Sequence, residues 1–334
     1  MAREVWVWAE RRRGRLLPVA LELLGRARGL ARDLGAVPAA VVAGHGVEEA
    51  AGELFARGAD RVYLLDHPLL EPYQAEACAE LLAGLARERG PAAILLGATA
   101  LGPELAARVA ARLGTGLTAH CVDLYVNEEG RLVQVVPGLN PGTLWEYVCL
   151  TDPQMATVKP GVFPLPAPEP GRRGEVVRVP CEVREESLRA RTLEAVEGEP
   201  AGPSLEEAGV VVAAGWGLRD AGGIEAAREL ARLLGAALGG TRPAVDQGWL
   251  PEELMIGQSG RTVSPRLFVS LGASGAMHFT TGFLGSGVVF AVDQNPRAPI
   301  FEVADVGIVG DLREVLPLLV GELRKRGVHP PPAK

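Results

Sequence analysis

Short apolar runs alternate with longer segments rich in alanine, leucine and arginine through the first part of this chain. The runs at residues 4–10, 36–44, 61–66 and 92–98 have the composition of β-strands, and helical patterns lie between and after them. Strands that are separated by helices pair in parallel, and the helices cover the faces of the sheet. The sequence therefore predicts an α/β fold built on a mainly parallel sheet.

The pattern changes after residue 118, where apolar and polar residues alternate on both sides of the Asn-Glu-Glu-Gly segment at 127–130. This alternation predicts an antiparallel hairpin added to the doubly wound sheet. Residues 160–180 contain six prolines, which predict an extended segment without a helix. The run at 175–183 still has the composition of a strand, and we assign it to the first domain.

A second break, at residues 197–209, precedes a new strand at 210–215. We expect an N-terminal α/β domain at residues 1–200 and a second domain with a parallel sheet at 201–334. In the second domain, apolar residues recur at helical spacing from Ile224 to Leu238, and short buried strands are expected at 266–272, 287–293 and 306–310. The strands end in Gly or Asp, which line the carboxyl edge of a parallel sheet, where ligands bind.

The composition excludes several classes of protein. With 34 basic and 41 acidic residues, the net charge of -7 argues against a nucleic-acid partner, and no apolar run has the length of a membrane span. Cys78, Cys121, Cys149 and Cys181 are spaced too widely for a metal or redox motif. The N-terminal residues have the wrong order for a signal peptide, so we expect a cytoplasmic protein without membrane insertion.

Small and polar loops follow successive apolar segments of the second domain. They lie at residues 215–218, 239–242, 257–260, 272–275, 293–296 and 310–312. One such loop can be a plain turn, and none of them is a GxGxxG fingerprint or a Walker loop. Several loops at one sheet edge instead indicate one long cofactor site, in which residues 273–276 offer backbone N–H groups to an anion such as a diphosphate.

From the sequence alone, three side chains near these loops can each be interpreted in two ways, and a fourth has one predicted role. Arg242 is either a surface arginine or a fixed cation, and His278 is either a helix-surface or packed residue or a cofactor contact. Trp216 belongs to the core or stacks on an aromatic ring. Asp311 precedes a helical run and is predicted to be its N-cap, which is compatible with ligand contact.

The run from residue 245 to 319, and above all APIFEVADVGIVGDL at 298–312, closely resembles the FAD domain of the electron-transfer flavoprotein α subunit. The first 200 residues fit the α/β N-terminal domain of that family with weaker motifs. Position by position, the resemblance implies an FAD site made of Trp216, Thr241, Arg242, Gly257, Gln258, Ser259, Gly260, Ser274, Gly275, Ala276, Met277, His278, Phe279, Asp293, Asp311 and Leu312.

The resemblance also implies a role for each part of this site. Residues 258–260 would lie at the isoalloxazine end, with the Ser259 hydroxyl near flavin N5 and Thr241 at nearby polar atoms. Arg242 would lie over the flavin rings and raise the one-electron potential. Residues 274–277 would surround the ribityl and diphosphate groups, and Asp311 with Leu312 the adenosine.

Three places depart from the pattern of that family. His278-Phe279 stands where the family usually has Gln-His, so the expected histidine is displaced by one residue. Trp216 replaces a usual arginine, and Asp293 replaces a usual asparagine. Loss of a cation and gain of an anion near a diphosphate are expected to weaken FAD binding or alter its potential, unless neighbouring groups compensate.

The resemblance implies a soluble electron carrier rather than a catalyst with its own substrate. Its FAD would accept electrons from acyl-CoA and other flavin dehydrogenases and pass them to a membrane quinone reductase. The N-terminal domain would contact a β subunit, and residues 197–209 would act as a hinge. Two alternatives stay open: an electron-bifurcating form that oxidises NADH through a second flavin in the β subunit, and a nucleotide-binding scaffold without redox function.

Overall fold

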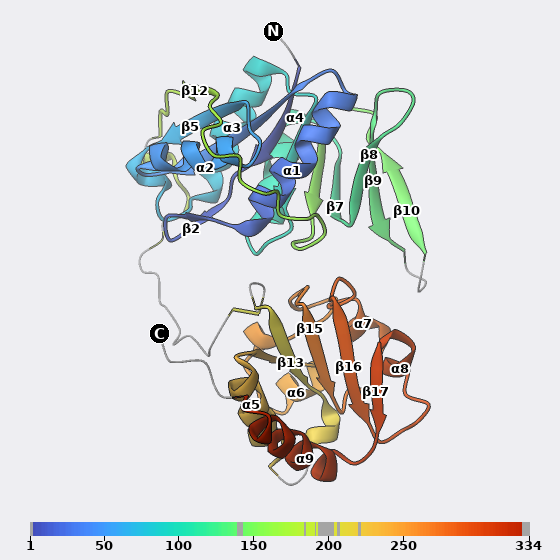
Figure 1. The fold of residues 1–334 in the computed structure, drawn as a ribbon. Helices are drawn as coiled ribbons and strands as arrows, with labels where there is room; N and C mark the ends of the chain where they lie inside the picture. Colours follow the sequence, from blue (N-terminus) through green and yellow to red (C-terminus); the bar gives the residue numbers. More distant parts are fainter. Residues whose placement is uncertain are drawn as a thin grey trace. The chain divides into compact units, whose positions relative to one another are not determined.

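The computed structural model describes residues 3–138, 143–183, 185–190, 192, 204–205, 208–219 and 222–328. The chain divides into two compact units, Met1–Val196 and Glu197–Lys334 (Figure 1). Most of the predicted hinge at 197–209, and the expected boundary after residue 200, lie outside the described residues.

A seven-stranded sheet forms the first unit, in the order β12-β5-β4-β1-β6-β11-β7, and all of its strand pairs are parallel. The strands are β1 (Glu4–Trp8), β4 (Val37–Gly44), β5 (Arg61–Asp66), β6 (Ala93–Gly97), β7 (Leu117–Cys121), β11 (Gln154–Val158) and β12 (Glu175–Arg178). The α/β fold and the parallel sheet predicted from the sequence are confirmed. The strand predicted at 175–183 is confirmed over Glu175–Arg178, where β12 pairs with β5, and residues 179–183 form no strand.

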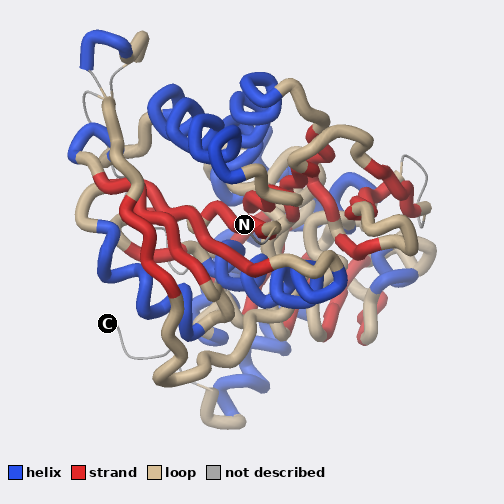
Figure 2. The backbone as a smooth tube through the Cα atoms, turned by 90° about the horizontal axis from the view of Figure 1, so that it is seen from above, coloured by secondary structure: helices blue, strands red, loops and turns tan. Residues whose placement is uncertain are grey.

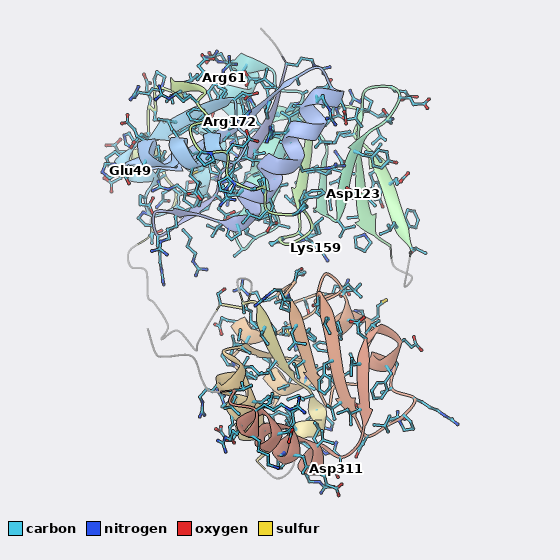
Figure 3. All side chains as sticks on the ribbon, in the orientation of Figure 1. Glu49, Arg61, Asp123, Lys159, Arg172 and Asp311 are labelled. Carbon is cyan, nitrogen blue, oxygen red and sulfur yellow. The ribbon has the colours of Figure 1, made fainter. Side chains whose placement is uncertain are left out.

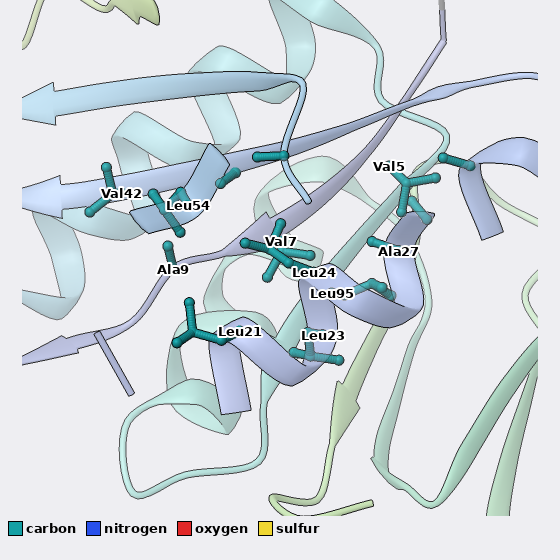
Figure 4. Packing of buried hydrophobic residues seen from close by; sticks show 14 of the residues in the cluster. Val5, Val7, Ala9, Leu21, Leu23, Leu24, Ala27, Val42, Leu54 and Leu95 are labelled. Carbon is teal, nitrogen blue, oxygen red and sulfur yellow. The ribbon is translucent and has the colours of Figure 1, made fainter. Parts of the chain in front are cut away.

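Helices cover both faces of this sheet, as Figure 2 shows. They are α1 (Pro18–Asp33), α2 (Ala50–Ala56), α3 (Ala75–Arg89) and α4 (Gly102–Leu113), with short 3-10 turns η1 (Val47–Glu49), η2 (Pro68–Leu70) and η3 (Glu185–Ser187). Because successive strand residues point to opposite faces, Val5 and Val7 pack with Leu24 of α1 (Figure 4). Trp6 lies instead in the core of the other face.

The predicted hairpin is present at the end of the first sheet. Strands β8 (Asp123–Val126) and β9 (Leu132–Pro137) are antiparallel, and the Asn127 N–H donates to the Arg131 carbonyl at 2.9 Å. Strand β10 (Leu144–Val148) adds to β9, and two-residue strands β2 (Arg11–Arg12) and β3 (Arg15–Leu16) form a second small ribbon. Residues 160–180, which are all described, contain no helix, as the prolines predict.

Five parallel strands form the sheet of the second unit, in the order β14-β13-β15-β16-β17. The strands are β13 (Val210–Ala214), β14 (Ala237–Gly240), β15 (Leu267–Leu271), β16 (Val288–Asp293) and β17 (Val306–Val309). The helices are α5 (Gly223–Leu234), α6 (Arg242–Asp246), α7 (Met277–Thr280), α8 (Ile300–Val303) and α9 (Leu312–Lys325), with 3-10 turns η4 (Trp216–Leu218) and η5 (Glu252–Leu254).

The order of these strands determines where a ligand can bind. The chain leaves β13 toward β14 on one side and returns to β15 on the other side, so the strand order reverses next to β13. In open α/β sheets, the crevice at the carboxyl ends of the strands beside such a reversal is the usual binding site. Helices α5 and α9 pack together on one face (Figure 1), and a second core around Phe268 and Phe283 fills the other face.

One helix is shorter than the sequence pattern predicts. The helical spacing continues to Leu238, but α5 ends at Leu234, where Gly235 adopts a left-handed conformation with φ 59°. Leu238 belongs instead to β14, whose backbone pairs with β13. Apolar spacing alone could not show this, because Leu238 is buried in the core in its strand position as well.

Candidate functional site

The second unit has a cavity of about 360 Å³ at the carboxyl edge of its sheet. This volume falls within the range of small-molecule sites. Segments that follow all five strands contribute to its wall, which is formed by Trp216, Gly217, Arg219, Thr241, Arg242, Pro243, Met255, Ile256, Gly257, Ser259, Gly272, Ala273, Ser274, Gly275, Ala276, His278, Phe279, Asp293, Gln294, Gly310, Asp311 and Leu312.

Most of the positions expected from the sequence meet at this cavity. They are Trp216, Thr241, Arg242, Gly257, Ser259, Ser274, Gly275, Ala276, His278, Phe279, Asp293, Asp311 and Leu312. Gln258, Gly260 and Met277 are outside the lining, although each is next in sequence to a lining residue or bonded to one. The loops at 257–260 and 272–275 therefore contribute to one cavity.

Glycine residues let three loops approach closely at one end of the cavity. The Gly217 N–H donates to the Gly272 carbonyl at 2.9 Å. Gly272 has φ +65°, and a β-carbon on it would lie 2.7 Å from the Gly217 Cα and 2.7 Å from Leu312 Cδ1. The turn η4, the loop after β15 and the start of α9 can meet there only because no side chain stands at Gly272.

The loop at 273–276 presents hydrogen-bond donors. Among the described residues, the backbone N–H groups of Ala273, Ser274, Gly275 and Ala276 donate to no carbonyl or side chain. Thr241 is buried, and its hydroxyl has no hydrogen-bond partner within the described residues. An unmet buried polar group costs about 1–3 kcal/mol, so the Thr241 hydroxyl fits a ligand that brings a polar atom to it. The N–H groups of the loop fit a ligand with acceptor oxygens.

His278 and Gln258 join α7 to the loop after η5. The Nδ1 atom of His278 lies 2.6 Å from Oε1 of Gln258, and the Gln258 N–H donates to the His278 carbonyl at 2.7 Å. His278 is the second residue of α7, and it forms part of the cavity wall rather than of the core. Its side chain is exposed, so the structure excludes a packed core position, and the cofactor contact stays a prediction.

Phe279 is placed differently from its neighbour His278. Its side chain is only 6% exposed, and its ring lies 5.0 Å from Phe283 and 6.1 Å from Phe268, measured between ring centroids. It borders the cavity from within this aromatic core. A histidine at this position would therefore have to place a polar ring among phenylalanines.

Arg242 begins α6 and borders the cavity with an exposed side chain. Its Nε donates to Asp246 Oδ1 at 2.7 Å, one helical turn later. This hydrogen bond and the carboxylate charge raise the pKa of Arg242 above its ordinary value, so the side chain is a permanent cation. Arg242 is thus an exposed arginine paired with Asp246, and its role as a fixed cation at the ligand stays a prediction.

Asp311 is the N-cap of α9, which confirms the prediction from the sequence. Its carboxylate accepts the Arg313 N–H at 2.9 Å and lies at the start of the helix, where it is labelled in Figure 3. The side-chain hydrogen bond from Arg313, together with that N–H, lowers the pKa of Asp311 to about 2. The carboxylate is therefore ionised at neutral pH, with a guanidinium beside it.

Trp216 stands in the cavity wall on η4 and is 41% exposed. Its ring stacks on Trp249, with 5.7 Å between centroids and 17° between planes. The guanidinium carbon of Arg219 lies 5.7 Å from the centroid of the same ring. Trp216 thus stacks on an aromatic ring of the protein itself, a contact that no local sequence pattern indicates.

The fold and the cavity define an α/β protein whose second unit has a small-molecule site at the carboxyl edge of its parallel sheet. Among the described residues, no helix has the length and hydropathy of a membrane span, and no cluster of three His, Cys, Asp or Glu side chains is placed to hold a metal.

Comparison with known proteins specifies this class further. A family model described as the electron transfer flavoprotein domain matches residues 5–183, and one described as the electron transfer flavoprotein FAD-binding domain matches residues 204–284. The chain belongs to the electron transfer flavoprotein α-subunit family. It is an electron-transfer protein, and its second unit is an FAD-binding domain.

Similarity to individual proteins extends over nearly the whole chain. It is 41% identical to an electron transfer flavoprotein subunit alpha of Thermoanaerobacterium thermosaccharolyticum, with 97% of this chain and 98% of that protein covered. Identity is 37% to the protein of the same name from Megasphaera elsdenii and 38% to a Protein FixB from Clostridium saccharobutylicum, with 96% of each chain covered in both cases.

The described residues fit FAD. The donors at 273–276 match a diphosphate, and the unmet hydroxyl of Thr241 matches a polar atom of the cofactor. Several lining residues were not expected from the sequence, and among them Gly217, Gly310 and Gln294 lie within loops that had been singled out. Arg219 lies one residue beyond such a loop, and no signal in the sequence pointed to it.

Proposed function

We propose that this chain is the FAD-carrying subunit of a cytoplasmic heterodimeric electron carrier. It accepts electrons from acyl-CoA and other flavin dehydrogenases and passes them to a membrane quinone reductase. The observation that carries the proposal is a cavity built from loops after all five strands, which offers unmet donors and the guanidinium of Arg242. Such groups bind a redox cofactor and adjust its charge environment.

When bound, FAD supplies the electron-transfer chemistry, and the protein binds and orients it. In this proposal, Gly257, Gln258, Ser259 and Gly260 hold the isoalloxazine end, with the Ser259 hydroxyl directed to N5. Arg242 contributes positive charge over the rings, and its bond to Asp246 at 2.7 Å keeps the guanidinium in place. A cation beside the flavin favours its negatively charged reduced states.

The remaining positions hold the rest of the cofactor. Ser274, Gly275, Ala276 and Met277 bind the ribityl and diphosphate groups through the backbone donors of the 273–276 loop. Asp311 and Leu312 contact the adenosine, and Asp293 lies beside the same part of the site. His278, bonded to Gln258 at 2.6 Å, takes the place of the histidine that the family usually carries one residue later.

A second subunit completes the protein in this proposal. The relatives from T. thermosaccharolyticum and M. elsdenii are named as alpha subunits, and we infer that this chain also pairs with a β subunit through its first unit. Strand β10 offers a suitable surface there, because Leu144, Trp145 and Tyr147 are between 48% and 64% exposed. Large exposed apolar patches of this kind are typical of protein interfaces.

Stepwise reduction of the purified complex tests the proposal. The chain is co-expressed with its partner subunit, and the visible spectrum is recorded while an acyl-CoA dehydrogenase and its substrate are added. We expect flavin absorption that bleaches under these conditions. Rapid bleaching by NADH alone would indicate the bifurcating form instead, and a complex that stays colourless after addition of FAD would indicate a scaffold without redox function.

A further inference from the structure

Arg242 and Asp246 form an ion pair at the cavity of the second unit. The Nε atom of Arg242 donates to Oδ1 of Asp246 at 2.7 Å. Arg242 lines the cavity, whereas Asp246 does not belong to its wall. The carboxylate of Asp246 therefore acts on a ligand in the cavity mainly through Arg242.

The order of the two charges in α6 is the opposite of the order that stabilises a helix. Arg242 is the first residue of α6, and Asp246 is the last. The N-terminus of a helix favours anions and the C-terminus favours cations, so an acidic residue four positions before a basic one is the better arrangement. Both side chains are also more than half exposed, and exposed ion pairs contribute little to stability. Helix stability therefore does not explain this pair.

The backbone anchors both residues of the pair to the sheet. The Thr241 N–H donates to the Ala214 carbonyl of β13 at 3.0 Å, which ties the start of α6 to the carboxyl edge of the sheet. Ala244, midway between the two charged residues, is fully buried in the core of the second unit. The exposed ion pair therefore stands on an anchored turn of helix.

A hydrogen bond through Nε leaves the other donors of Arg242 available. A guanidinium carries one N–H on Nε and four on its two Nη atoms. Within the part of the chain that the structure describes, the side chain of Arg242 makes no hydrogen bond besides the one to Asp246. Asp246 thus holds one edge of the guanidinium and limits how it can turn, while both Nη groups stay able to reach a ligand.

Asp246 also changes how strongly Arg242 acts on a ligand. The hydrogen bond to Asp246 and the charge of that carboxylate raise the pKa of Arg242, and the charge of Glu252 adds to this effect. The two carboxylates therefore lie close enough to Arg242 to offset part of its positive charge. Reduction adds negative charge to a flavin, so Arg242 favours the addition of an electron at this end of the cavity and Asp246 opposes it.

We propose that Asp246 is a positioning residue that sets the reduction potential of bound FAD through Arg242. Its carboxylate orients the guanidinium and, at the same time, keeps the potential below the value that Arg242 alone would produce. The inference rests on the proposed function, in which Arg242 lies over the flavin rings. It goes further by giving a residue outside the cavity wall control over the potential, and it does not depend on which proteins donate or accept the electrons.

Two substitutions of Asp246 separate the effect of its charge from the effect of its hydrogen bond. Asp246→Asn and Asp246→Ala both remove the negative charge, but only asparagine keeps an oxygen that can accept the Nε–H. The first one-electron reduction potential of FAD is measured by spectroelectrochemical titration of the full chain with its partner subunit. Asp246→Asn should raise this potential by up to about 59 mV, a tenfold change in the one-electron equilibrium. Asp246→Ala should raise it by less, because the guanidinium is no longer held.

A double-mutant cycle tests whether Asp246 acts through Arg242. In an Arg242→Ala background, Asp246→Asn and Asp246→Ala should give equal potentials, because no guanidinium is left to orient. Glu252→Gln and Glu252→Ala are the matched controls and should also equal each other, because Glu252 acts on Arg242 by charge without a hydrogen bond. A potential in Asp246→Asn at or below that of the wild type, or equal potentials for the two Asp246 variants when Arg242 is present, would overturn the inference alone. A wild-type complex that binds no FAD would overturn the proposed function as well.

Discussion

At the scale of single residues, Arg242 is the cation whose removal should change the flavin most directly. Arg242→Ala takes a positive charge away from the cavity wall, so the first one-electron reduction potential of bound FAD should fall. Each 1.4 kcal/mol of lost attraction corresponds to about 59 mV for a one-electron step. A spectroelectrochemical titration of the purified complex measures the change.

Two variants serve as controls for this prediction. Asp246→Asn keeps the guanidinium and removes the carboxylate that accepts its Nε–H at 2.7 Å, so the potential should not fall. Arg232→Ala removes a positive charge from exposed helix surface outside the cavity and should leave the potential unchanged. A potential that stays the same in Arg242→Ala contradicts the role assigned to Arg242.

Asp311 makes stability depend on pH in a defined direction. Hydrogen bonds from Arg313 lower the pKa of Asp311 to about 2, below the ordinary value of 3.8. A depressed pKa means that this carboxylate contributes stability above about pH 4, and the contribution is lost as the pH falls toward 2. The free energy of unfolding of Asp311→Ala should therefore lie below that of the wild type near neutral pH, and the difference should shrink in this window.

Denaturant unfolding at fixed pH values measures that difference. Asp311→Asn is the matched variant, because an asparagine oxygen can still accept the Arg313 N–H at the N-cap. It should be more stable than Asp311→Ala at every pH, and the deficits of both variants relative to the wild type should shrink as the pH falls. A difference between Asp311→Ala and the wild type that stays constant from pH 6 to pH 2 would rule out the ionic contribution.

At the scale of elements, the meeting of η4, the loop after β15 and α9 depends on Gly272. Gly272→Ala places a β-carbon 2.7 Å from the Gly217 Cα, which is too close. The backbone at Gly217 or at Gly272 has to move, and both residues line the cavity. Gly248→Ala is a close control. Gly248 has a similar φ, +71° compared with +65° for Gly272, but a β-carbon added to it would have no other atom within 4 Å. Both variants carry the strain of a left-handed alanine, and only Gly272→Ala should also lose FAD affinity.

Equilibrium binding of FAD to the two glycine variants checks this expectation. Far-ultraviolet circular dichroism of the same samples establishes that both are folded. Equal affinities would mean that the close approach at Gly272 does not shape the site. A loss of affinity in Gly248→Ala as well would assign the effect to backbone strain rather than to the collision.

Elements whose signals are local could be predicted from the sequence. Most strands of the two sheets and the hairpin around residues 127–130 depend on runs and alternations that a short window contains, and the structure confirms them. Strands β7, β11 and β14 were not predicted as members of the parallel sheets. The end of α5 could not be predicted, because the apolar spacing continues to Leu238. The left-handed Gly235 and the pairing of β14 with β13 outweigh that spacing.

The candidate site likewise has features that could be predicted from the sequence and features that could not. Its loops could be predicted, because the carboxyl ends of parallel strands meet at one edge and each strand there is followed by small or polar residues. The stack of Trp216 on Trp249 could not be predicted, because it joins residues far apart in the chain. The position of Arg219 beside the Trp216 ring depends on the directions of the side chains, which the sequence does not contain. The burial of Phe279 among phenylalanines likewise follows from tertiary packing, which no spacing rule contains.

At the scale of the whole molecule, the buried apolar residues form separate cores in the two units. The two clusters on the first sheet contain only residues of Met1–Val196, and the two clusters on the second sheet contain only residues of Glu197–Lys334. A domain with its own core can unfold on its own. The cavity lies wholly within the second unit, so a bound cofactor should stabilise that unit selectively.

Calorimetry of the full chain with and without FAD tests this selectivity. A ligand that binds only the folded state stabilises it by about 2.7 kcal/mol when its free concentration is 100 times the dissociation constant. We expect two unfolding transitions, of which one moves to higher temperature as FAD is added while the other stays in place. Gly272→Ala should reduce the shift of the first transition, because it weakens the site, whereas Gly248→Ala should preserve it. Equal shifts of both transitions, or one transition at every FAD concentration, would mean that the two cores do not unfold separately.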